Sequence, residues 1–246
     1  MPKIETINLS KSYDNREIIK NINITLNNRE LVSLLGISGT GKTTLFHIIA
    51  GLVLPDSGQV LLDGNNITGQ PGKISYMLQK DLLFPYKKII DNICLPLSIQ
   101  GIKKHEARKQ VLPYFQEFGL QGTEYKYPHQ LSGGMRQRAA LLRTYIAATG
   151  IALLDEPFSA LDTITKTSMH TWYLNIMQRI NLSTLFITHD IDEAIFLSDR
   201  IYILGGNPAK IIDEIQVIEK RPRSKEFLLT ETFLKYKRHI IEKLNI

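Results

Sequence analysis

The residues of this chain best suited to binding phosphate lie in one short segment, Gly36–Thr44. It reads GISGTGKTT and follows an apolar run at residues 31–35, while a helix-like stretch follows at residues 45–50. Glycines let the backbone turn tightly and point successive N–H groups into one concavity. The positive end of the following helix faces the same point. The segment is therefore predicted to be a phosphate-binding loop between a strand and a helix.

Two side chains of this loop have specific expected roles. Lys42 can reach the β- and γ-phosphates of a nucleotide, and the Thr43 hydroxyl can ligate Mg²⁺. A chance glycine turn is the alternative, but the flanking strand and helix argue against it. The nucleotide contacts expected in the loop are Gly36, Ser38, Gly39, Thr40, Gly41, Lys42, Thr43 and Thr44.

Polar residues end two later apolar runs. Residues 151–155 form a run that is typical of a buried parallel strand, and it ends on Asp155 and Glu156. Residues 183–188 form another, followed by His189. Open α/β sheets bind ligands at the carboxyl ends of their strands. We therefore expect Asp155 to hold Mg²⁺, Glu156 to polarise an attacking water and His189 to contact the γ-phosphate.

A second glycine segment precedes the strand that ends on Asp155. Residues 131–138 read LSGGMRQR and are expected to open a helix that runs through Ala148. Gly133 and Gly134 leave N–H groups at the start of this helix uncovered, as an anion site requires. The motif is weak alone, and its position directly before the acidic strand makes it a candidate site.

The elements that position these residues form an α/β fold. Alternating residues 4–9 and 22–26 predict antiparallel strands, with a turn at 11–15 and a second hairpin at Asn27-Asn28 before the strand at residue 31. Tyr13 in the first turn could pack, or could stack on an adenine ring. Prolines punctuate residues 83–148, which are expected to form a helical insert whose clearest helix is 103–118. Helices are expected at 165–180 and in the tail, where Leu229, Phe233, Tyr236, Ile240 and Leu244 recur at helical spacing and should dock on the domain.

Composition excludes several classes of protein. The chain of 246 residues contains no run of 18 apolar residues, and its amino terminus lacks the apolar core of a signal peptide. A single cysteine, Cys94, allows no intramolecular disulfide and is expected to be buried, which fits a reducing cytoplasm. The net charge is +6, and half of the excess lies in residues 207–246. Because acids are mixed with those bases, we interpret the tail as a solvated face rather than a nucleic-acid or lipid site.

Taken in order, these motifs resemble those of the ATP-binding subunits of ABC transporters, over nearly the whole chain. The resemblance implies a P-loop NTPase of the ABC type, a single domain over residues 1–246 with a helical subdomain at about 83–148 and a helical tail at about 224–246. It also implies that Tyr13 stacks on adenine, that Gln79 contacts Mg²⁺ and senses a membrane partner, and that Lys42 and Glu156 act in ATP hydrolysis with His189. Ser132, Gly133 and Gly134 belong to the signature motif, and Asp162 ends the D-loop.

The same resemblance implies partners. Two copies are expected to bind head to tail around two ATP molecules, each site taking its phosphate loop from one copy and Ser132, Gly133 and Gly134 from the other. The family places such a dimer on transmembrane permease subunits at the cytoplasmic face of the membrane, with an extracytoplasmic solute-binding protein as an indirect partner.

Within the family the chain is similar to importers of the nitrate, sulfonate and taurine class. The grounds are the short passage from Asp63 to Gln79, the hairpin at residues 205–210 and the Arg221-Pro222-Arg223 segment. Relatives of that class also carry riboflavin or pyrimidine precursors of thiamine, so the cargo stays open.

Two other classes are possible. A soluble ABC ATPase that acts on ribosomes or DNA usually carries two cassettes or a long coiled-coil insertion, and neither is visible here. A P-loop kinase or GTPase would leave the signature motif, Gln79 and His189 without a role. An ATPase subunit of a membrane importer is therefore the favoured hypothesis.

Overall fold

The smaller of two β-sheets contains the amino terminus. The computed structural model describes residues 1–245. Its antiparallel sheet has the order β2-β1-β4-β5, with β1 at Ile4–Tyr13, β2 at Arg16–Leu26, β4 at Ser57–Leu62 and β5 at Asn65–Asn66. The first turn is shorter than predicted. It contains only Asp14 and Asn15, both at positive φ, because β1 continues through Tyr13 and pairs with Arg16.

The larger sheet carries the ends of the predicted catalytic strands. Its order is β10-β9-β3-β8-β7-β6, with β3 at Leu31–Leu35, β6 at Ser75–Met77, β7 at Ile151–Asp155, β8 at Ser183–Thr188, β9 at Arg200–Gly205 and β10 at Lys210–Gln216. All of its pairs are parallel except β9 with β10, which form the expected closing hairpin. The hairpin predicted at Asn27-Asn28 is wrong, because β2 pairs with β1 whereas β3 pairs with β8 and β9.

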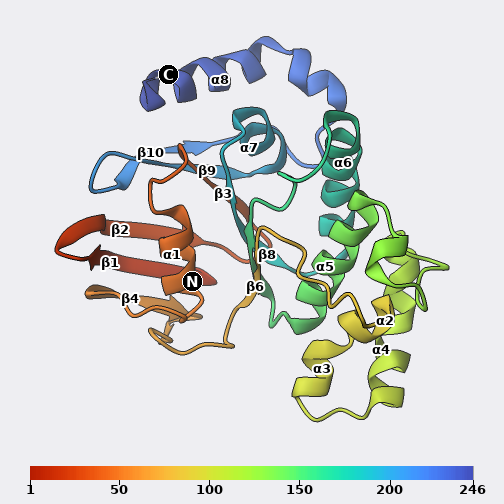
Figure 1. Cartoon of the computed structure of the whole chain (residues 1–246). Coiled ribbons are helices and arrows are strands. Elements are labelled where there is room, and N and C mark those ends of the chain that lie inside the picture. The colour runs from red at the N-terminus through yellow and green to blue at the C-terminus, as the bar shows by residue number, and fades with distance from the viewer. Residues whose placement is uncertain (246) are drawn as a thin grey trace.

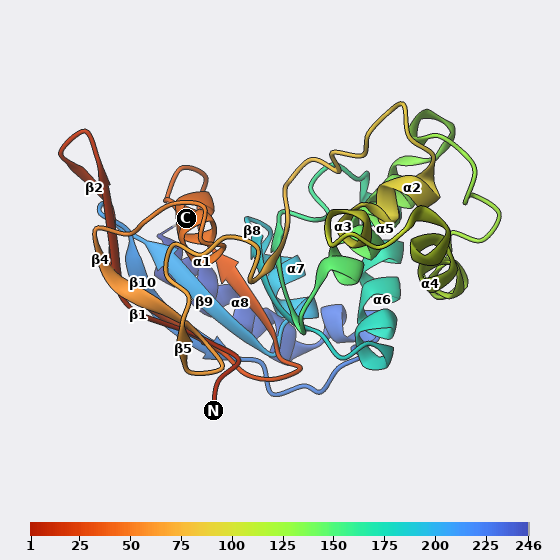
Figure 2. The same ribbon diagram turned by 90° about the horizontal axis from the view of Figure 1, so that it is seen from below.

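Helix α1 (Lys42–Ile49) lies between the two sheets (Figure 2). Its buried Leu45, Phe46, Ile48 and Ile49 share one core with β1, β2 and β4 and with alternate residues of the large sheet. In β7, for example, Ile151 and Leu153 belong to this core, whereas Ala152 and Leu154 belong to the core on the opposite face. Strands buried on both faces are continuously apolar, which explains the uninterrupted runs in the sequence.

The helical insert lies on the opposite side of the large sheet from the antiparallel sheet (Figure 2). It contains α2 (Ile89–Ile93), α3 (Leu95–Ile99), α4 (Lys104–Glu117), a 3₁₀ turn η1 (Pro128–Gln130) and α5 (Gly133–Ala147). Helix α4 buries Ala107, Val111 and Phe115 at a spacing of four, and Pro113 lies within it rather than between helices. Helix α5 begins at Gly133, two residues after the predicted start, because Ser132 caps it. Cys94 is buried, as predicted.

The carboxyl-terminal elements belong to the same core as the helical insert, on the same face of the large sheet (Figure 1). They are α6 (Thr163–Arg179), α7 (Ile191–Leu197), a 3₁₀ turn η2 (Lys225–Leu229) and α8 (Glu231–Leu244). Helix α8 docks through buried Phe233 and Ile240, with Tyr236 and Leu244 packed beside them. Leu229 was wrongly assigned to this face; it is 85% exposed, because it ends η2 before α8 begins.

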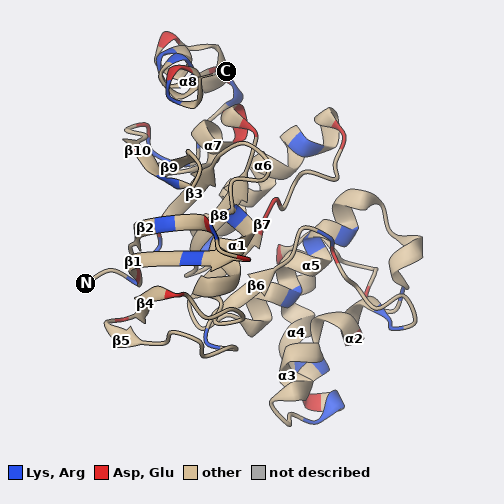
Figure 3. Cartoon of the chain, turned by 60° about the vertical axis from the view of Figure 1, so that its left-hand side comes forward, with Lys and Arg blue, Asp and Glu red and all other residues tan. Residues whose placement is uncertain are grey.

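Both signs of charge occur on this last helix (Figure 3), which carries four Lys or Arg and two Glu. The mixture agrees with a solvated outer face. Within residues 1–245, no helix is both long enough and apolar enough to cross a membrane.

Candidate active site

The predicted phosphate loop connects β3 to α1 in the expected way. Gly41 has φ +87° and precedes the helix, and a side chain there would meet Ile18 and Ile19 at 2.9 Å. At Gly36 a Cβ would lie 2.6 Å from the Leu204 carbonyl oxygen. The first turn of α1 has no side-chain cap and no acidic residue. A helix start without a cap or an acid leaves its N–H groups and its dipole to an anion.

Lys42 is folded back over the loop. Its Nζ donates to the carbonyl oxygens of Gly36 and Ile37, both at 2.8 Å, and the residue is buried. Burial lowers the pKa of Lys42, while the charges of Glu156 and Asp155 act in the opposite direction. The Lys42 ammonium therefore lies against the backbone of the loop.

Asp155, at the end of β7, lies directly behind the loop. Its Oδ2 accepts hydrogen bonds from the Tyr76 hydroxyl at 3.1 Å and from the Thr43 hydroxyl at 3.4 Å. Burial raises the pKa of Asp155, and the hydrogen bond from Tyr76 opposes that rise. Sequence reasoning missed Tyr76, because an aromatic residue in the apolar run 74–78 has the pattern of a core residue.

Glu156 joins two other predicted residues. Its Oε2 accepts from Gln79 Nε2 at 2.9 Å, and its Oε1 lies 3.0 Å from His189 Nδ1. The backbone of Glu156 has φ +45° and its N–H donates to the Ile187 carbonyl oxygen at 3.1 Å. Three residues far apart in the sequence thus meet at the carboxyl ends of β6, β7 and β8.

A cavity of about 480 Å³ collects most of the predicted site. Ile18 also lines this cavity, which the sequence did not predict. An apolar residue in a β-hairpin has the pattern of a core residue. The predicted residues that line the cavity are Tyr13, Ser38, Gly39, Gly41, Lys42, Thr43, Thr44, Gln79, Glu156 and His189. Tyr13 is 45% exposed, and the Lys11 ammonium lies over its ring, 5.4 Å from the ring centre.

The signature residues lie elsewhere. Ser132 Oγ accepts from Met135 N and caps α5, and Asp162 caps α6 by accepting from Thr165 N. A Cβ on Gly134 would lie 3.2 Å from a methyl group of Thr165. Gly133 lines a second cavity, of about 740 Å³, which shares Gln79, Glu156 and His189 with the first. Within one chain, Ser132, Gly134 and Asp162 are therefore not brought to the phosphate loop.

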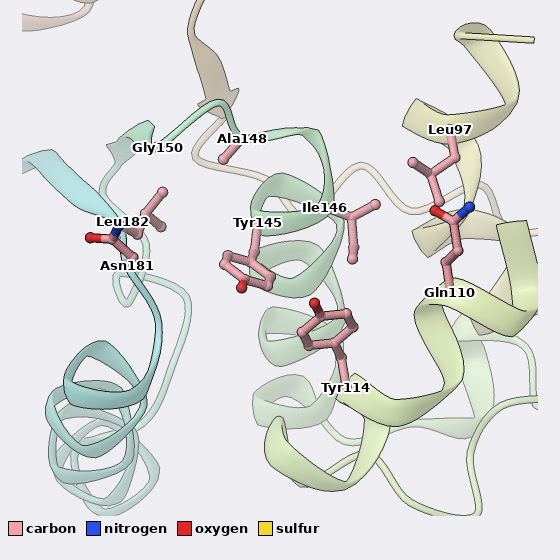
Figure 4. Close-up of a pocket in the computed structure, with 9 residues that line it drawn as sticks. All are labelled: Leu97, Gln110, Tyr114, Tyr145, Ile146, Ala148, Gly150, Asn181 and Leu182. Carbon is pink, nitrogen blue, oxygen red and sulfur yellow. The ribbon is translucent and has the colours of Figure 1, made fainter. Parts of the chain in front are cut away.

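A further cavity, of about 520 Å³, contains none of the predicted residues. It lies between α4, α5 and the segment before β8, where the rings of Tyr114 and Tyr145 pack edge to face at 5.4 Å (Figure 4). It shares no lining residue with the two cavities at the strand ends, so it is separate from the site described above.

These observations define a class. A glycine loop at an uncapped helix start, a buried lysine that donates to that loop and two adjacent acids at the end of β7, with only β8 between β7 and β3, make the molecule a P-loop nucleotide-binding protein.

Comparison with known proteins gives the family. The chain belongs to the ABC transporter family, since residues 19–159, more than half of its length, match that family's model. The resemblance, the fold class and the expected ATPase type are thereby confirmed.

Individual relatives agree. The formylaminopyrimidine import ATP-binding protein ThiZ of Halalkalibacterium halodurans is 45% identical over 200 residues, which cover 81% of this chain and 78% of the relative. The nitrate import ATP-binding protein NrtD of Synechocystis sp. is 37% identical over 224 residues, covering 89% and 84%. Among solved structures, the bacterial ABC transporter cassette MJ0796, seen as a dimer, superimposes with a TM-score of 0.75 at 27% identity, covering 88% of this chain and all of that one.

Proposed function

We propose that this chain is the ATP-hydrolysing subunit of an ABC importer for a small organic or inorganic solute. Two relatives named as import ATP-binding proteins support the direction of transport, and their different solutes leave the cargo open. The importer would work from the cytoplasmic face of the membrane, and an extracytoplasmic solute-binding protein would deliver the cargo to the permease.

The observation that carries the proposal is the contact of Glu156 with both Gln79 and His189 beside the phosphate loop. In the proposed mechanism, Lys42 and the loop N–H groups hold the β- and γ-phosphates, and Tyr13 stacks on the adenine ring. Glu156 accepts a proton from the attacking water, while Gln79 and His189 orient that water and the γ-phosphate.

The donor set also fits Mg²⁺. The Thr43 hydroxyl and the Asp155 carboxylate lie 3.4 Å apart, and the Gln79 amide lines the same cavity as Thr43. Hard oxygen donors of this kind are what Mg²⁺ prefers. When bound, the ion would neutralise phosphate charge.

A head-to-tail dimer accounts for the second glycine segment. Ser132, Gly133 and Gly134 start α5 away from the phosphate loop of their own chain, and we propose that they close the nucleotide site of a second copy, with Asp162 nearby. The MJ0796 cassette supports this arrangement, since it is dimeric also in a post-hydrolysis state bound to ADP and Pi, with a TM-score of 0.74.

We place the permease contact on residues 79–86 and the helical insert. The loop between β6 and α2 exposes Leu82 by 51% and Tyr86 by 70%. Large apolar side chains so exposed at one edge are typical of a docking surface. Gln79, the first residue of this segment, donates a hydrogen bond to Glu156 and so links the proposed surface to the active site.

The Glu156→Gln variant tests the hydrolytic role. Glutamine keeps the shape of the side chain but cannot accept the proton, so ATP should bind and hydrolysis should fall by about 100-fold or more. With saturating Mg-ATP the variant should accumulate as a dimer in light scattering, whereas the wild type should not. Normal turnover by a monomeric variant would refute the assignment.

A pull-down of the tagged chain in mild detergent, from its own membranes, tests the transport role. Mass spectrometry should find a multi-spanning permease. Ribosomal or DNA-bound partners without a membrane protein would move the assignment to a non-transport ABC ATPase.

A further inference from the structure

Helix α6 contacts the loop that carries His189 through a lysine. Lys166 Nζ lies 2.6 Å from Asp190 Oδ2 and 3.0 Å from Glu193 Oε2. The Lys166 side chain is 20% exposed and that of Glu193 is 3% exposed, so water screens these contacts only partly. Lys166 thus connects α6 to the residue directly after His189.

Asp190 is held from three directions. Besides Lys166, its Oδ1 accepts from Glu193 N at 3.0 Å and caps α7, and its own N–H donates to the Thr188 hydroxyl at 3.0 Å. The His189 side chain is 52% exposed, so its backbone is the main determinant of where the ring lies. Fixing Asp190 therefore restrains the His189 backbone from which the ring reaches Glu156.

The same face of α6 supports the other side of that contact. His170, one turn after Lys166, packs edge to face on Phe158 at 4.9 Å, and Phe158 lies two residues after Glu156. His170 Nε2 is also 3.8 Å from Glu193 Oε2. One turn of α6 thus touches both the loop after β7 and the loop after β8.

We propose that Lys166 is a positioning residue for ATP hydrolysis, which holds His189 against Glu156 through its ion pair with Asp190. The inference rests on the function proposed above. Lys166 is expected to act by holding the loop, without touching the nucleotide.

The charge states agree with this geometry. Burial alone would lower the pKa of Lys166, but the hydrogen bond to Asp190 and the charge of Glu193 outweigh it and raise that pKa. Burial acts to raise the pKa of Asp190, but the bond to Lys166, the charge of that lysine and the Glu193 N–H together lower it. Burial raises the pKa of Glu193 to about 7, so Asp190 is the more constant anionic partner of the lysine near neutral pH.

The test compares Lys166→Met with Lys237→Met in the full-length chain. Lys237 is a matched control, because both lysines line one cavity of about 290 Å³, whereas Lys237 pairs with Asp192 at 2.7 Å and not with Asp190. We expect Lys166→Met to lower kcat for ATP about 10- to 100-fold, the effect of misplacing a reacting group by about 1 Å, with little change in KM. Lys237→Met should stay within about twofold of the wild type.

Three further variants separate positioning from folding. Asp190→Asn keeps the α7 cap, since asparagine caps as well as aspartate, but removes the ion pair; it should lose kcat as Lys166→Met does. The double variant should lose little more than either single one. Lys166→Arg, which keeps the charge, should recover most of the activity.

A direct readout follows the ring itself. Of the six histidines, the His189 imidazole can be assigned in ¹⁵N spectra by its loss in His189→Ala. Its resonances should shift in Lys166→Met and Asp190→Asn but not in Lys237→Met. An unmoved resonance, or a kcat equal to that of Lys237→Met, would overturn the inference. Normal hydrolysis by Glu156→Gln would instead overturn the proposed function.

Discussion

Glu156 adopts a backbone conformation that few non-glycine residues use. Its φ of +45° lies in the left-handed region, which costs on the order of 1–3 kcal/mol unless neighbours enforce it. Here the N–H bond to Ile187 and the contacts with Gln79 and His189 enforce it. The Glu156 carboxylate contacts Gln79 and His189, whereas that of Asp155 accepts from Tyr76 and Thr43, so the two adjacent acids can serve different roles.

Tyr76 supports the first of the two adjacent acids, Asp155, through a hydrogen bond. Tyr76→Phe removes the hydroxyl that donates to buried Asp155, so the free energy of unfolding should fall by about 1–3 kcal/mol. The Mg²⁺ concentration for half-maximal ATP hydrolysis should rise several-fold, because the carboxylate loses the donor that orients it.

Urea unfolding and a Mg²⁺ titration check both effects. The control is Tyr125→Phe, whose ring is 59% exposed. An unchanged Mg²⁺ requirement together with unchanged stability would show that Tyr76 does not support Asp155.

At this scale, the sequence was informative where a polar residue interrupts an apolar run. Asp155, Glu156 and His189 lie at the ends of buried strands, where packing alone does not explain a polar side chain. Tyr76 and Lys166 could not be found that way. An aromatic residue in a strand and a lysine on a helix have the commonest patterns in proteins, and only the fold brings their partners, 79 and 24 residues away, into contact.

Helix α7 is fixed at both of its ends. Asp190 caps its start, and at its end Arg223 Nη1 donates to the carbonyl oxygens of Ile195 at 3.2 Å and Phe196 at 2.9 Å. Arg223 is 5% exposed, and burial lowers its pKa to about 10, so it stays charged at neutral pH. A cation at the carboxyl end of a helix satisfies orphan carbonyls and complements the dipole.

Arg223→Met should therefore destabilise the protein. Two buried carbonyl groups lose their charged donor, which should lower the free energy of unfolding by about 2–3 kcal/mol. Urea unfolding monitored by circular dichroism measures this.

The exposed Arg179, in the last turn of α6, gives the comparison. Arg179→Met should change stability by less than about 0.5 kcal/mol. Equal effects of the two substitutions would mean that Arg223 does not secure α7.

The sequence predicts whether a segment is a helix or a strand better than it predicts which strand it pairs with. The strands at residues 22–26 and 31–35 are both real, and Asn27-Asn28 does separate them, but the two strands enter different sheets. Turn residues report local backbone geometry, whereas pairing depends on β8 and β9, more than 150 residues later. The prediction for Leu229 is wrong for a related reason. Helical spacing in the sequence does not show where a short 3₁₀ turn ends and an α-helix begins.

At the scale of the whole molecule, substitutions in the two glycine segments test the proposed head-to-tail dimer. Lys42→Ala should disable the phosphate loop of its own chain, and Gly133→Asp should place an anion in the signature segment. Each homodimer should be inactive. In a mixed dimer one site combines both defects, and the other combines the two intact segments.

Mixing equal amounts of the two variants should thus restore up to about a quarter of wild-type ATPase activity, because half of the dimers are mixed and half of their sites are intact. Mixing each variant with itself is the control. Absence of any recovery, with mixed dimers demonstrated by differential tags, would contradict sites shared between two copies.

Gln79, Glu156 and His189 line both the nucleotide cavity and the cavity beside Gly133. Any binding event in one cavity that moves these side chains carries a coupling free energy to the other, and such coupling is reciprocal. If a partner docked beside Leu82 raises the affinity for ATP by some factor, ATP must raise the affinity for that partner by the same factor. Affinity for nucleotide and affinity for the membrane partner are then two measurements of a single linked equilibrium.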